Sequence, residues 1–155
     1  MAHPKRVANQ DGADAPYEAD LAAWALEQAS YLRARAWSKL DLSNLIEEVE
    51  AVARTERNAL TSAFRIILLH MLKWDHQPSH QTRSWSTSIR VQRLAALERL
   101  EDSPSLSAQV DQLMTRAYRK ARIEAADETG LAERIFPEAC PYTLDEILNR
   151  AFPWS

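Results

Sequence analysis

Residues 41–85, DLSNLIEEVEAVARTERNALTSAFRIILLHMLKWDHQPSHQTRSW, decide the fold. Each residue of an α-helix advances about 100° around the axis, and by that count one apolar stripe runs along much of the stretch. Its members are Leu45, Val49, Val52, Ala53, Leu60, Ala63 and Ile67. From Phe64 to Leu72 apolar side chains point in every direction, which is typical of a buried helix.

The ends of this helix can be placed from its flanking residues. Asp41 or Ser43 can cap its start, and Pro78 forces the preceding residue out of the helical region, so the helix should end near residues 74–76. That gives more than thirty residues, roughly 50 Å at 1.5 Å per residue. We therefore expect one long central helix against which other helices pack.

The rest of the chain predicts further helices and no sheet. Helical patterns cover residues 16–37, 82–101 and 104–128, and a short C-terminal helix should open with the Thr-x-x-Glu capping box at Thr143 and end near residue 151. Gly12 and Gly130 are the two glycines of the chain, which excludes glycine-rich phosphate loops and dinucleotide fingerprints. We predict an all-α fold, a helical bundle of four main helices organised around the long central one, plus a short C-terminal helix.

Length and composition set the class of protein. The 155 residues suit one domain over residues 16–155, and residues 1–15 lack periodicity and should form a flexible arm. Cys140 is the single cysteine, which rules out an intrachain disulfide and multi-cysteine zinc sites. We see no signal region or membrane span and expect a cytoplasmic protein without a membrane partner. The net charge of −3 speaks against general nucleic-acid binding.

Polar residues on inward-facing positions suggest a possible site inside the bundle. Glu56 and His70 interrupt the apolar stripe of the central helix, and two glutamates continue the inward face of the 104–128 helix. The candidate ligands for a divalent metal are Glu56, His70, Glu124 and Glu128, and the candidate catalytic residues are Glu56, His70 and Glu128. Bundle interiors can hold such sites. Alternatively these groups are buried hydrogen-bond partners, for example Glu56 with Gln28 or Arg93.

A second candidate lies in the turn KWDHQPSHQTR, residues 73–83, which holds two histidines four residues apart. Pro78 between His76 and His80 disfavours the helical geometry that would let both bind one metal, so we interpret the turn as a solvated corner.

Cys140 is a third candidate, as a nucleophile. Its neighbours, Ala139 and Pro141, supply no base, and a packed thiol is the simpler interpretation.

A fourth candidate is local nucleic-acid contact. Residues 73–99 hold five Lys or Arg and two acids, so this stretch carries +3 while the remainder carries −6. Trp74 and Trp85 could stack on bases. Both tryptophans, however, fall on positions that should face the core, and solvated helix faces often show such imbalances.

Several segments carry a family resemblance when taken in succession. NLIEEVE, HMLKWDHQP, a Ser-Trp pair shortly after, SPSL and FPEACPY together resemble the bacterial family named domain of unknown function 29, over about Tyr17 to Phe152. The resemblance implies a compact all-helical bacterial protein. It brings no activity, cofactor or catalytic residue.

The leading functional hypothesis from the sequence is a non-catalytic interaction or scaffold protein that can self-associate. Helical surfaces with uncovered apolar stripes commonly pair, and we expect an exposed Trp154 to contribute to such a surface. The alternatives are a metal-dependent hydrolase and nucleic-acid contact through residues 73–99. Whether the protein is an enzyme is left open.

Overall fold

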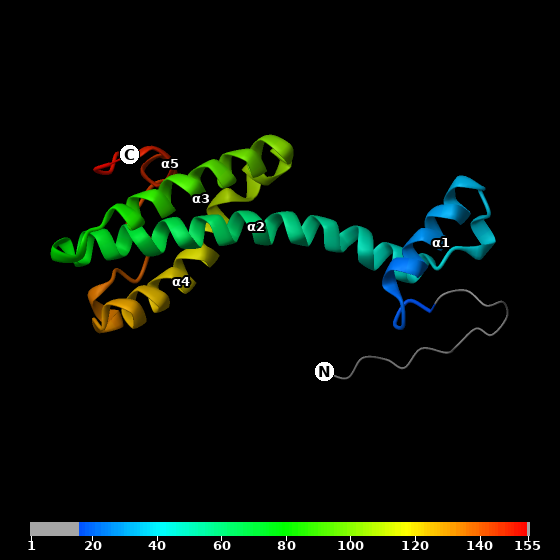
Figure 1. The fold of residues 1–155 in the computed structure, drawn as a ribbon, viewed down its shortest axis with the longest axis horizontal. Coiled ribbons are helices and arrows are strands. Elements are labelled where there is room, and N and C mark those ends of the chain that lie inside the picture. Colours follow the sequence, from blue (N-terminus) through cyan, green and yellow to red (C-terminus); the bar gives the residue numbers. More distant parts are fainter. Residues whose placement is uncertain (1–15, 155) are drawn as a thin grey trace. The chain divides into compact units, whose positions relative to one another are not determined.

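The computed structural model describes residues 16–154, and the predicted arm at residues 1–15 lies outside this range. Every regular element from residue 16 to residue 154 is a helix (Figure 1), which confirms the predicted all-α fold. The α-helices are α1 (Leu21–Arg33), α2 (Leu42–His76), α3 (Arg83–Asp102), α4 (Val110–Thr129) and α5 (Leu144–Asn149), and short 3₁₀ helices lie at Trp37–Lys39, Pro78–His80, Pro104–Gln109 and Glu133–Ile135. Over these residues no helix combines the length and apolar character needed to cross a bilayer.

The chain divides into two compact units, one ending at Ala51 and the other beginning at Val52. A compact unit is not by itself a separate domain. The prediction of one domain over residues 16–155 therefore stays a prediction, and each unit is described on its own.

In the first unit α1 is shorter than the predicted helix over residues 16–37. Asp20 caps α1 by accepting a hydrogen bond from the Ala23 amide at 2.9 Å, and the positive φ of 54° at Arg35 follows its end. Gln28 is buried, and its Oε1 accepts a hydrogen bond from the Asp41 amide at 2.8 Å. Gln28 therefore holds the connection that leads into α2, and its predicted pairing with Glu56 stays a prediction.

The second unit holds the main core, which is built on α2 from Leu60 onward. The core residues of α2 include Leu60, Phe64, Ile67, Leu68, Met71 and Leu72, all fully buried. Helices α3 and α4 add Ile89, Ala96, Leu113, Ala117 and Ala121, and the C-terminal part adds Phe136, Ile147 and Phe152. The predicted central helix and its end at residues 74–76 are thus confirmed.

The apolar stripe predicted for α2 is buried only in part. Val49 and Val52 are 69% and 66% exposed, so these two members of the stripe lie outside the core to which Leu60 belongs. Within the second unit, the buried side chains of α2 begin at Leu60. Periodicity identifies an apolar face but does not say how far the partner helices extend along it.

Local capping signals set most of the other helix boundaries. Thr82 caps α3, Gly130 ends α4 with a positive φ of 70°, and Thr143 forms the predicted capping box with Glu146. The predicted helix over residues 104–128 is different at its start, because Pro104–Gln109 forms a 3₁₀ helix and α4 begins only at Val110.

Candidate functional site

The three carboxylates predicted for a metal site each form an ion pair. Glu56 lies 3.3 Å from Arg99 of α3, Glu124 of α4 lies 2.6 Å from Arg65, and Glu128 of α4 lies 2.5 Å from Lys73. These pairs join α2 to α3 in one case and to α4 in two. Their geometry fits a role in positioning helices against one another.

Lys73 is the most buried of these cations. Only 8% of the residue is exposed, and its Nζ lies 4.6 Å from the centre of the Trp85 ring while it donates to Glu128. The aromatic face and the carboxylate together compensate the buried charge. Lys73 therefore links α2 to both α3 and α4.

His70 lies one turn before Lys73 and beside the same tryptophan. The ring centres of His70 and Trp85 are 6.4 Å apart, and the buried Nδ1 of His70 has no hydrogen-bond partner among residues 16–154. Burial, assisted by the positive charge of Lys73, lowers the pKa of His70, although Glu128 opposes the shift. The imidazole is thus neutral at neutral pH. Of the predicted site residues, the structure brings His70 and Glu128 into one electrostatic cluster, and Lys73 belongs to it.

No group of three or more His, Cys, Asp or Glu side chains between residues 16 and 154 has a geometry that could hold a metal ion. Glu56 and Glu124 are engaged by Arg99 and Arg65. The metal site and the hydrolase activity predicted from Glu56, His70, Glu124 and Glu128 stay predictions.

The histidines of the 73–83 turn have separate partners. His76 Nδ1 lies 2.9 Å from the Leu72 carbonyl oxygen, and its ring packs 4.7 Å from that of Phe136. His80 shares a hydrogen bond with Ser79. His76 and His80 therefore do not face a common site, which agrees with the prediction from the position of Pro78.

Two residues considered as chemical candidates are occupied by packing. Trp74 is buried, with its ring 5.2 Å from that of Phe152, which leaves no free face for stacking on a base. Cys140 is half-buried and donates to the Tyr142 carbonyl at 3.5 Å. Burial raises the pKa of the Cys140 thiol, so little of the nucleophilic thiolate exists at neutral pH.

A polar clasp joins the end of α2 to the C-terminal part. The Asp75 carboxylate accepts hydrogen bonds from Arg150 at 2.6 and 2.8 Å and from the Tyr142 hydroxyl at 2.8 Å. Arg93 of α3 donates to the carbonyls of Ile147, Arg150 and Glu146. The last carbonyls of α5 are therefore satisfied by a side chain from another helix, and the predicted pairing of Arg93 with Glu56 is wrong.

The outward side of α3 exposes large apolar side chains. Val91, Leu94 and Leu97 are 56%, 59% and 49% exposed. By the helical count, Leu94 lies about 180° from Trp85, on the side of α3 turned away from the core. We define the outer face of α3 as Arg83, Thr87, Arg90, Val91, Leu94, Leu97, Glu98 and Glu101.

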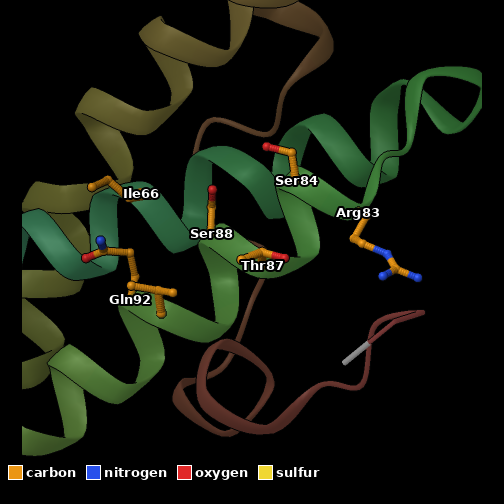
Figure 2. A pocket seen from close by; sticks show the side chains of 7 residues that line it. Ile66, Arg83, Ser84, Thr87, Ser88 and Gln92 are labelled. Carbon is orange, nitrogen blue, oxygen red and sulfur yellow. The ribbon is translucent and has the colours of Figure 1, made fainter.

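An open groove of about 600 Å³ borders this face (Figure 2). Its lining residues are Ile66, Arg83, Ser84, Thr87, Ser88, Val91 and Gln92. Ile66 comes from α2 and all the others from α3. Because hydroxyl and amide groups share the lining with only two aliphatic side chains, the groove extends the outer face as a mixed polar and apolar surface.

The sequence profile of the family Domain of unknown function DUF29 matches residues 16–153. The chain belongs to the DUF29 family. Comparison with curated proteins and with solved structures gave no match. The DUF29 match spans all five α-helices, and it confirms the resemblance seen in the succession of sequence segments.

In this DUF29 chain, sequence reasoning missed the clasp and the outer face of α3. Asp75 and Arg150 are 75 residues apart, so no local spacing connects them. The outer face was visible in principle, since the helical count places Val91, Leu94 and Leu97 at least about 120° around the helix from Trp85, which should face the core. The signal for the outer face of α3 was the number of apolar residues on the side of that helix expected to be polar.

Proposed function

We propose that this DUF29 domain is a non-catalytic protein-interaction module whose binding surface is the outer face of α3. The observation that supports the proposal is the exposure of Val91, Leu94 and Leu97, three large apolar side chains within two turns of one helix. Single exposed apolar residues are ordinary, but apolar side chains grouped on one face are typical of interaction sites.

The energetics favour covering this face. Burying apolar surface contributes roughly 25 cal/mol per Å². A rigid helix also binds with little loss of backbone entropy, because α3 is already ordered by its packing on α2. A partner helix or sheet can therefore cover the outer face without the entropy cost of ordering α3.

The polar groups of the second unit support the same proposal. Glu56, Glu124 and Glu128 face arginine or lysine side chains, and a carboxylate in such a pair is less available as a metal ligand or general base. A metal-dependent hydrolase centred on Glu56, His70 and Glu128 is the weaker proposal, because Glu56 and Glu128 would have to leave their cations to act.

Site-specific photo-crosslinking tests the proposal. A benzophenone amino acid replaces Leu94 in the full chain, produced in the cells that naturally make it, and in a matched variant it replaces Ile123. Ile123 lies on α4 and is 58% exposed, almost the same as Leu94. We expect defined protein adducts from position 94 and few from position 123. Equal adduct yields from both positions, or none from position 94, would contradict the proposal.

A further inference from the structure

The outer face of α3 carries its charges in two halves. Arg83 and Arg90 lie in the first half and Glu98 and Glu101 in the second, with Leu94 between them. By the helical count, Arg83, Leu94 and Glu101 fall within about 20° of one line along α3, and Arg90 and Glu98 within about 40°. The face is therefore basic at one end, apolar in the middle and acidic at the other end.

The order of these charges opposes the dipole of α3 itself. The N-terminus of a helix favours negative side chains and its C-terminus positive ones, yet Arg83 and Arg90 lie toward the N-terminus and Glu98 and Glu101 toward the C-terminus. The glutamates are three residues apart, where like charges repel. The stability of α3 alone does not account for this arrangement.

The charged groups of the outer face have few partners within the chain. Among residues 16–154, Arg83, Glu98 and Glu101 form no ion pair, and Arg90 donates one long hydrogen bond, 3.4 Å, to the Trp154 carbonyl. Arg99, by contrast, lies off the face and is paired with Glu56. The two halves are thus available to a partner of complementary charge.

We propose that the outer face of α3 binds the outer face of a second copy of this chain, with the two α3 helices antiparallel. In that arrangement the basic half of each helix faces the acidic half of the other, and the opposed dipoles attract. A two-fold axis makes such a surface complementary to itself. The inference rests on the proposed function, because it names the partner of the same surface.

A two-fold axis between Leu94 and Leu97 brings the apolar middle of the face and one pair of opposite charges together. It places Leu94 against Leu97 of the second copy and Arg90 opposite Glu101 of the second copy, each contact occurring twice. The Trp154 carbonyl, which accepts the hydrogen bond from Arg90, places the C-terminal segment at the edge of the contact. Two single helices bury a small interface, so the dimer should be weak, with dissociation in the micromolar range.

Sedimentation velocity of the purified full chain over a micromolar concentration series tests this dimer. The variants are Arg90→Glu, Glu101→Arg and the double reversal. Each single reversal sets like charges opposite each other twice, and we expect it to weaken dimerisation about tenfold. The double reversal restores opposite charges, so it should return the dissociation constant to near that of the unchanged protein. Asp127→Arg, an exposed charge reversal on α4, is the matched control and should have no effect.

Three results would overturn the inference: a monomer at every concentration, a dimer that the single reversals do not weaken, or a weakened dimer that the double reversal does not restore. Melting temperatures of all variants establish that each is folded. If the chain is monomeric but position 94 captures a different protein, the self-association fails and the proposed function stands. If position 94 captures nothing, both fail.

Discussion

The Asp75 carboxylate and the Arg150 guanidinium form a two-pronged ion pair, with N–O distances of 2.6 and 2.8 Å. The pair fixes the chain after α5 to the end of α2, and the Arg150 guanidinium also lies 5.0 Å from the centre of the Phe152 ring. Such bidentate pairs are more specific in geometry than single contacts. The C-terminal part thus depends on a charge at the end of the central helix.

Replacing Arg150 by alanine should loosen this attachment. We expect Arg150→Ala to lower the free energy of unfolding by about 1–2 kcal/mol, because it removes two charge-assisted hydrogen bonds and a cation–π contact. Urea denaturation measures the change. Arg134→Ala, which removes an exposed arginine with no ion pair among the described residues, is the control and should stay within about 0.5 kcal/mol of the unchanged protein. Equal effects of the two variants would contradict the role of the pair.

The same pair predicts acid sensitivity. Burial alone would raise the pKa of the Asp75 carboxyl, but the hydrogen bonds from Arg150 and Tyr142 outweigh it and hold the pKa below its ordinary value. The folded chain therefore binds this proton more weakly than the unfolded chain. Ionised Asp75 makes its full contribution to the free energy of unfolding above the ordinary carboxyl pKa of about 3.9. That contribution is lost as the pH falls through the lowered pKa of the folded chain. The stability difference between the unchanged protein and Asp75→Asn should shrink over that range. A difference that does not change with pH speaks against the pair.

His70 predicts a second pH effect at milder acidity. Burial and then Lys73 lower its pKa, so the unfolded chain takes up the proton first as the pH falls below about 6.5. The unchanged protein should therefore lose stability relative to His70→Gln between about pH 7 and about pH 5. Urea denaturation at several pH values measures this loss. Parallel pH profiles for the two proteins would show that His70 is not held neutral.

The ion pair between Lys73 and Glu128 should be asymmetric under mutation. Glu128→Gln leaves a nearly buried ammonium with the Trp85 face as its main compensation, and we expect a loss of about 1–2 kcal/mol in the free energy of unfolding. Lys73→Met removes the buried charge and keeps the apolar packing, so it should cost less than about 1 kcal/mol. Chemical denaturation of both variants decides the matter. The reverse order would mean that the charge of Lys73 itself is needed for packing.

Substitutions of Gly130 test how α4 ends. Its φ of 70° is costly for a residue with a Cβ, while a Cβ built there meets no atom within 4 Å. Gly130→Ala should therefore cost about 1 kcal/mol through backbone strain alone. Thermal or urea unfolding measures this cost. Gly130→Asn, which tolerates the left-handed region better, should cost less. A neutral alanine variant would mean that the helix end can adopt another conformation.

The sequence predicts the helices well because their signals are local. The apolar run from Phe64 to Leu72 identifies the central helix, and Pro78, Gly130 and Thr143 act on neighbouring residues. Partners distant in sequence are different. Glu56 pairs with Arg99, and Gln28 holds the Asp41 amide, because packing decides which side chains meet. The helical count places a polar group on an inward face but cannot choose its partner.

The most direct test of the interaction surface is hydroxyl-radical labelling of Leu94 and Ile123 in the same chain. Their exposed fractions, 59% and 58%, are nearly equal, so the purified, dilute protein should label both at rates set by side-chain chemistry alone. Labelling inside the cells that make the protein then reports what covers each face. We predict that the ratio of Leu94 to Ile123 labelling falls in the cell relative to the dilute protein. An unchanged ratio would contradict the claim that α3 presents an interaction surface.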